Sequence, residues 1–250
     1  MAVISSAFNS HPYLLATKGE YIDLKSGLSF KPDPELLLSQ STIVAREEGE
    51  PVRWLDFLFE ATGGDSDYVR FLQRWFGYCL TGDIKEHALA FIYGPGGTGK
   101  STLVKIMQEI FGSYARSAPM ETFTISRGDR HPTELAMMEG KRLITASETE
   151  RGRSWAESRI KQLTGGDRIP ARFMKQDFFE FDPQFKLVIV GNYAPALSGC
   201  DESMRRRFHV MPFMHQPQHK DLDLHAKLVL EAGRILNWII QGAVEWQRVD

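Results

Sequence analysis

The stretch Gly94–Ser101, GPGGTGKS, matches the spacing G-x-x-x-x-G-K-[ST]. An apolar run at 88–93 leads into it. Apolar side chains spaced three and four residues apart follow it over 103–111, before Gly112. A strand, a glycine-rich loop and a helix in this order are the context that a phosphate-binding loop requires, so this stretch predicts one.

The loop residues have distinct predicted roles toward a nucleoside triphosphate. Glycines let backbone N–H groups turn toward phosphate oxygens, and the start of the helix adds partial positive charge. Lys100 supplies a full charge to the β- and γ-phosphates, and the Ser101 hydroxyl is a candidate ligand for Mg²⁺. We therefore expect ATP and Mg²⁺ as cofactors. The predicted binding residues are Gly94, Pro95, Gly96, Gly97, Thr98, Gly99, Lys100, Ser101 and Thr102.

Three more strand-like runs follow the loop, at 142–147, 186–191 and 208–211, with helical patterns between them. This alternation predicts an α/β fold, a P-loop NTPase sheet of parallel strands with helices on both faces. Ligands of such sheets bind beyond the carboxyl ends of the strands. Polar residues at those ends are therefore the site candidates.

The part of the chain before this alternation has a different pattern. Residues 13–30 carry short β-type stretches broken by glycines, which predicts a hairpin or small meander. Helical periodicity follows at 52–62 and 67–80. We expect a small N-terminal unit of hairpin and helices at 1–82 and a core at 83–250 that ends in an amphipathic helix.

Two acidic residues follow the run at 142–147. A carboxylate beside the phosphates can hold Mg²⁺, and another can orient or deprotonate the attacking water. Glu148 is the first candidate and Glu150 the second, provided that their strand neighbours the one before the loop. The alternative is a pair of solvated surface carboxylates.

Polar residues also flank the last two runs. Asn192 follows the run at 186–191, where its amide can hydrogen-bond the γ-phosphate or the attacking water. Alternatively, it is a turn residue before Pro195. Arg205, Arg206 and Arg207 precede the last run. Guanidinium groups suit the charge on a transferring phosphoryl group, particularly when a neighbouring subunit inserts them. The alternative is a solvated basic edge.

Residues 168–181 alternate in the manner of a hairpin. Arg172 and Lys175, with a phenylalanine beside the arginine, could contact a nucleic-acid backbone by charge and a base or sugar by stacking. Ordinary solvated hairpin charges are the alternative. Ser154 and Glu157 form a predicted capping box for the helix before this segment.

Composition sets broad limits. With 30 basic and 32 acidic residues, the chain has no global basic signature, so contact with nucleic acid must come from a local cluster. The two cysteines cannot build a disulfide framework. Without a long apolar stretch or a secretory signal pattern, we expect a cytoplasmic protein with no membrane partner.

The order of these motifs resembles that of the superfamily 3 helicases, in particular the phage and plasmid primase-helicases and their poxvirus relatives. The motifs are GPGGTGKST, SETE, IKQLTGGDRIPARF, KLVIVGN and RRRF. The segments YIDLKSG, LLLSQST, RWLDFLFE and FLQRWFGYCLTGD are similar to the region that precedes the helicase core in that family. The resemblance thus extends over most of the chain.

This resemblance implies an AAA+-like core that assembles into a homo-hexameric ring, hydrolyses ATP between subunits and moves single-stranded DNA through a central channel. By position, the resemblance implies that Lys100 and Ser101 bind the nucleotide and magnesium, that Glu148 is the acidic site and that Asn192 is the sensor. It also implies that Arg172 and Lys175 lie on the hairpin that contacts DNA, and that Arg206 or Arg207 is the arginine finger that acts on the neighbour's ATP.

Two departures leave assignments open. The second motif reads SETE, without adjacent acids, so the roles of Glu148 and Glu150 are not divided. Three consecutive arginines leave the finger open by one residue. Because no primase segment precedes the N-terminal unit, we expect an excised fragment of a longer phage or plasmid replication protein that acts in the bacterial cytoplasm.

Two other functions share the phosphate loop. One is a P-loop ATPase that assembles, or loads partners onto DNA, without unwinding. The other is a small-molecule phosphotransferase, which the hairpin and the arginines disfavour. DNA-stimulated ATP hydrolysis and strand separation distinguish the three.

Overall fold

The computed structural model describes residues 7–125, 133–148, 152–197, 199 and 201–248. Its centre is a five-stranded sheet ordered β10-β4-β9-β6-β5, and every neighbouring pair is parallel. Its strands are β4 (Leu89–Tyr93), β5 (Ala115–Ser117), β6 (Leu143–Glu148), β9 (Lys186–Gly191) and β10 (Phe208–Pro212). The predicted α/β fold is confirmed. The edge strand β5, short and partly exposed, had no clear apolar pattern to predict it.

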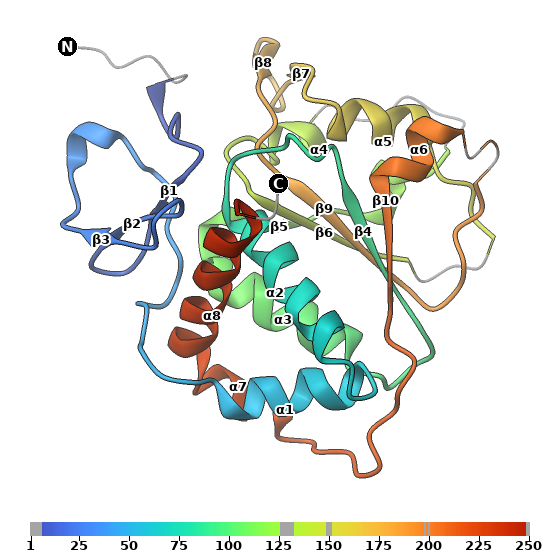
Figure 1. Cartoon of the computed structure of the whole chain (residues 1–250). Coiled ribbons are helices and arrows are strands. Elements are labelled where there is room, and N and C mark those ends of the chain that lie inside the picture. The colour runs from blue at the N-terminus through green and yellow to red at the C-terminus, as the bar shows by residue number, and fades with distance from the viewer. Residues whose placement is uncertain (1–6, 126–132, 149–151, 198, 200, 249–250) are drawn as a thin grey trace.

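Helices cover both faces of this sheet (Figure 1). Side chains of β4 alternate between two cores, with Ala90 and Ile92 in one and Leu89 and Phe91 in the other. The first core packs against α1 (Val52–Ala61), α2 (Ser66–Leu80), α3 (Lys100–Phe111), α7 (Leu224–Val229) and α8 (Ala232–Trp246). The second packs against α4 (Thr133–Ala136), α5 (Glu157–Thr164) and α6 (Glu202–Arg207). None of the described helices could cross a bilayer.

The N-terminal residues form the predicted meander and helices. Strands β1 (Leu14–Ala16), β2 (Tyr21–Asp23) and β3 (Ser29–Phe30) are antiparallel, and α2 packs along α8. The first core therefore combines side chains from both predicted units. A division at residue 82 into separately folding units stays a prediction.

Short 3-10 helices complete the described elements: η2 (Pro34–Leu36), η3 (Gly112–Tyr114) and η4 (Met120–Phe123). The hairpin predicted at 168–181 is present as β7 (Ile169–Ala171) and β8 (Phe179–Phe181). The predicted capping box is wrong: α5 has Ala156 at its N-cap and no side-chain cap hydrogen bond. Glu157 instead accepts a hydrogen bond from the backbone N–H of Gly199.

Two fully buried cations at the amino edge of the sheet fasten the N-terminal residues to it. Arg142, just before β6, donates to the carbonyls of Leu80, His11 and Leu14. The Lys186 ammonium, at the start of β9, donates to the carbonyls of Thr81, Asp83 and Gln184. Each cation also lies over a tyrosine ring, Tyr114 for Arg142 and Tyr78 for Lys186. Backbone dipoles and aromatic faces take the place of a carboxylate at both.

Burial and, to a smaller extent, the charge of Arg142 lower the pKa of Lys186 to about 7, while Cys79 and Asp83 oppose the shift. The unfolded chain keeps an ordinary lysine, so between this value and about pH 9 it binds a proton that the folded chain does not. The free energy of unfolding of the wild type should therefore rise from pH 7 to 9, relative to that of Lys186→Met. Urea unfolding across this range measures it. Parallel curves for the two proteins would show that Lys186 stays charged in the fold.

Candidate nucleotide-binding site

The glycine-rich loop connects β4 to α3 at the carboxyl edge of the sheet. Its path depends on glycine at Gly94, where φ is 154° and an added Cβ would lie 1.9 Å from the Phe213 carbonyl oxygen. The Phe213 N–H in turn donates to the carbonyl of Tyr93, at 2.6 Å. Gly99 has φ 88°, and a Cβ there would lie 2.6 Å from the ring of Phe57. The loop is thus held between α1 and the chain that leaves β10.

Lys100 is buried at the first turn of α3. Its Nζ donates to the carbonyls of Gly94 at 2.8 Å and Pro95 at 2.6 Å, and it lies 3.4 Å from Oγ1 of Thr98. Burial lowers the pKa of this amine. The cation is therefore placed inside the loop and satisfied by the loop's own oxygens, which are weaker partners than a charged phosphate oxygen.

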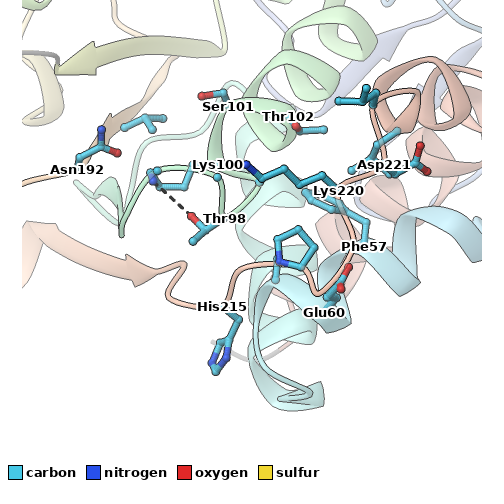
Figure 2. Close-up of a pocket in the computed structure, with 18 of the residues that line it drawn as sticks. Phe57, Glu60, Thr98, Lys100, Ser101, Thr102, Asn192, His215, Lys220 and Asp221 are labelled. Atoms are coloured by element: carbon cyan, nitrogen blue, oxygen red, sulfur yellow. Dashed lines mark hydrogen bonds between the residues drawn. The ribbon is translucent and has the colours of Figure 1, made fainter.

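A cavity of about 600 Å³ opens on this loop. Figure 2 shows Lys100, Ser101 and Asn192 on one side of it and Phe57 and Glu60 on the other. Gly96 to Thr102 line it from the loop, while the predicted residues Gly94 and Pro95 lie behind and hold Lys100. A cavity of this size suits a nucleotide-sized ligand.

Glu148, the last residue of β6, lines the same cavity. The condition set for this candidate, that its strand neighbours β4, is not met, because β9 lies between the two. All three strands are parallel, so Glu148 pairs with Gly191, which pairs with Tyr93 at the end of β4. The carboxylate reaches the loop across one intervening strand.

The Glu148 carboxylate is 6% exposed and only half satisfied. Its Oε1 accepts a hydrogen bond from Nε1 of Trp155 at 3.1 Å, whereas Oε2 is buried and has no partner among the described residues. Burial raises the pKa of Glu148, although the Trp155 hydrogen bond and the charge of Arg153 lower it. A buried carboxylate oxygen without a partner is costly in a purely structural role, and it is suited to accept a proton or bind a cation.

The other predicted residues divide between the cavity and the rest of the chain. Asn192 is exposed and lines the cavity, directly after β9. Glu150 lies outside the described residues. The hydroxyl of Ser101 and the carboxylate of Glu148 are both on the cavity wall, a donor pair that fits Mg²⁺ when phosphates and water complete its shell. No cluster of three or more acidic, histidine or cysteine side chains that could hold a metal occurs anywhere in the described chain.

Many residues of the cavity wall belong to α1 and to the segment 213–223 that follows β10, here called the crossing segment. The sequence pattern did not indicate them as site residues. The Arg53 side chain on α1 donates to Asp221 at 2.7 Å, as does Lys227 of α7. Hydrogen bonds from Lys227 and Arg53 lower the pKa of Asp221. These contacts fix the crossing segment above the loop, where the Lys220 side chain extends into the cavity (Figure 2).

The three arginines lie at the opposite edge of the sheet. They end α6, and the first residue of β10, Phe208, pairs with Leu89 at the beginning of β4. Five residues of strand, about 16 Å, separate this edge from the loop. Arg205 and Arg206 are exposed, whereas Arg207 is buried and its Nη1 donates to the carbonyl and hydroxyl of Ser203. None of the three lines the cavity.

The hairpin also extends from the amino edge (Figure 1). Lys175 is at its tip with φ 61°, and the Arg172 guanidinium lies 4.6 Å from the ring centroid of Phe178. Phe173 stacks on Phe179, and Met174 and Phe178 are exposed. Charged and aromatic side chains are thus presented together at the tip.

Known proteins share parts of this sequence. Residues 92–207 match a family model described as "Family of unknown function (DUF5906)". A protein of Acanthamoeba polyphaga mimivirus named "Putative helicase" is 25% identical over 81% of the chain, and one of Sputnik virophage with the same kind of name is 26% identical over 54%. The chain spans only 22% and 18% of the length of these relatives.

The fold is shared with solved structures. The apo structures of the NrS-1 C-terminal region superpose with a TM-score of 0.64 at 14% identity, over 89% of this chain and 52% of the other in one case and 93% and 57% in a second. At this identity the likeness concerns the fold alone.

Gly94→Ala and Gly96→Ala add the same methyl group at two positions of the loop. At Gly94 the methyl meets the Phe213 backbone, whereas at Gly96 nothing lies within 4 Å. We expect Gly94→Ala to lower Tm on the order of 5 °C and to weaken nucleotide binding, because the loop must leave its position. Gly96→Ala should melt like the wild type. Equal melting of both variants would contradict the contact between the loop and the crossing segment.

Proposed function

We propose that this chain is the ATP-hydrolysing motor of a helicase, in which each active site is completed by a neighbouring subunit. One observation carries the proposal: Lys100, Ser101, Glu148 and Asn192 line one cavity although they come from different strand ends. The motif order of superfamily 3 helicases and the similarity to viral proteins named as helicases support the choice of function.

Lys100 and Ser101 hold the phosphates in this proposal. The Lys100 amine exchanges the carbonyls of Gly94 and Pro95 for phosphate oxygens, a gain because bonds between charged groups are the stronger ones. Ser101 and Glu148 would hold Mg²⁺, which neutralises charge on the phosphate oxygens when bound. The N-terminus of α3 adds its partial positive charge.

Glu148 and Asn192 act on the attacking water. Because Oε1 is bound to Trp155, the unpaired Oε2 of Glu148 has one of two uses: it orients the water from the Mg²⁺ shell, or it accepts the proton of the water while Ser101 holds the metal. The Asn192 amide donates to the γ-phosphate or to the water and distinguishes the nucleotide states. Glu150 is the second candidate in this proposal for a carboxylate that acts on Mg²⁺ or on the attacking water.

The charge of the transition state is met by an arginine of the next subunit. Of the two arginines that the motif order implies, exposure favours Arg206, because Arg207 is buried and bound to Ser203. An arginine at the amino edge cannot reach its own cavity, so a closed ring of like subunits is the economical arrangement. We propose a homo-hexamer.

Single-stranded DNA is the proposed partner of the hairpin. Arg172 and Lys175 contact phosphates, and the exposed phenylalanines offer faces for base stacking. An ATPase that loads partners without unwinding would use the same site. Strand separation on a forked substrate distinguishes the two.

Lys100→Ala should lower ATP hydrolysis by about 100-fold or more. Lys175→Ala should keep hydrolysis without DNA within about twofold and lose its stimulation by single-stranded DNA. Lys18→Ala removes an exposed lysine of the N-terminal meander and is the matched control, with stimulation retained. Normal hydrolysis by Lys100→Ala would refute the site, and normal stimulation of Lys175→Ala would refute the hairpin assignment alone.

Mixing two inactive variants tests catalysis across the interface. Glu148→Gln and Arg206→Ala should each be inactive but able to bind ATP. In mixed rings, a site with an intact Glu148 meets an intact Arg206 from its neighbour, so activity should recover to a fraction of the wild-type rate, as measured by phosphate release. No recovery at any mixing ratio would place the arginine and the glutamate in one subunit's site.

A further inference from the structure

Trp155 lies at the junction of three elements of the candidate site. The side chain is fully buried, and its Nε1 donates to Oε1 of Glu148 at 3.1 Å. Its backbone N–H donates to the carbonyl of Ala196, at 3.0 Å, in the segment that follows Asn192. No motif in the sequence pointed to this tryptophan.

The Trp155 ring is held on two sides by the second core. Its centroid lies 5.4 Å from that of Phe91 of β4, edge to face, and 5.7 Å from that of Phe208 of β10. Phe208 directly follows Arg207 and α6. The same ring therefore touches the strand that leads into the phosphate loop and the strand that follows the arginines.

We propose that Trp155 is the positioning residue of Glu148, and that it ties the orientation of this carboxylate to the arginine-bearing helix α6. The indole N–H engages Oε1, which leaves Oε2 as the oxygen available for water or a cation, beside Gly191 on the cavity wall. Rotation of the carboxylate would break a buried hydrogen bond to a charged group. The proposal rests on the proposed function, in which Glu148 acts in hydrolysis.

The contacts of the Trp155 ring connect the arginines of α6 to Glu148. When Arg206 binds a neighbour's nucleotide, a shift of α6 also moves Phe208, which follows this helix directly and packs on the indole. A displacement of the indole moves the donor of the Glu148 hydrogen bond. Occupancy of one site is thereby communicated to the glutamate of the next through a contiguous set of packed side chains.

Trp155→Phe keeps an aromatic ring and removes the N–H donor. We expect kcat for ATP to fall about 10- to 100-fold, the rate equivalent of one lost hydrogen bond to a charged group, with the affinity for a fluorescent ADP analogue unchanged. Trp75→Phe is the matched control, because Trp75 is also buried and its Nε1 has no partner among the described residues. Its kcat should stay at the wild-type value.

Indole N–H resonances give a readout apart from activity. The chain has five tryptophans, and the Trp155 signal is identified by its absence in Trp155→Phe. Glu148→Gln should shift this signal and leave that of Trp75 in place. An unmoved Trp155 signal, or equal kcat in Trp155→Phe and Trp75→Phe, overturns the proposal. A wild type inactive on ATP, or an active Glu148→Gln, overturns the proposed function, while the resonance shift still tests the contact.

Discussion

The hydrogen bonding of β4 between β10 and β9 is the constraint on which the candidate site depends. Parallel pairing brings the ends of these strands to one edge, so that the loop after Tyr93, the residue after Gly191 and the crossing segment after Pro212 all meet there. The same pairing sends α6 and the hairpin to the other edge. One sheet thus separates nucleotide chemistry from the surfaces that would engage a neighbour and DNA.

Charges in this molecule are buried where backbone carbonyls or a single side chain can satisfy them. Arg142 and Lys186 donate to carbonyls and fasten the N-terminal residues to the sheet. Lys100 does the same within the loop. Glu148 differs in its position, because its unpartnered Oε2 belongs to a residue on the cavity wall, whereas the unpartnered Nε of Arg142 lies at the opposite edge of the sheet. A carboxylate oxygen without a partner on the cavity wall is placed to accept a proton or bind a cation.

The helices and strands that could be predicted best from the sequence are those with long apolar patterns. Four of the five central strands, α3 and the phosphate loop follow from local spacing and glycine positions. The edge strand β5 did not, because a three-residue edge strand buries too little to leave a pattern. The roles of Trp155 and of the crossing segment could not be predicted for another reason. Their contacts with Glu148 and Arg53 arise from tertiary packing and leave no local pattern in the sequence. Whether β4 and β6 are neighbours could not be predicted either, since chain order does not determine strand order, and β9 lies between them.

A structure with ADP, Mg²⁺ and a fluoride mimic of the transferring phosphate tests the central claim most directly, namely that Lys100 and Glu148 form one hydrolytic site. The Lys100 Nζ should leave the carbonyls of Gly94 and Pro95 for the phosphates, and Oε2 of Glu148 should contact the attacking water or the metal shell while Oε1 stays on Trp155. A nucleotide bound away from the loop, or a Lys100 amine still on its two carbonyls, would contradict the account.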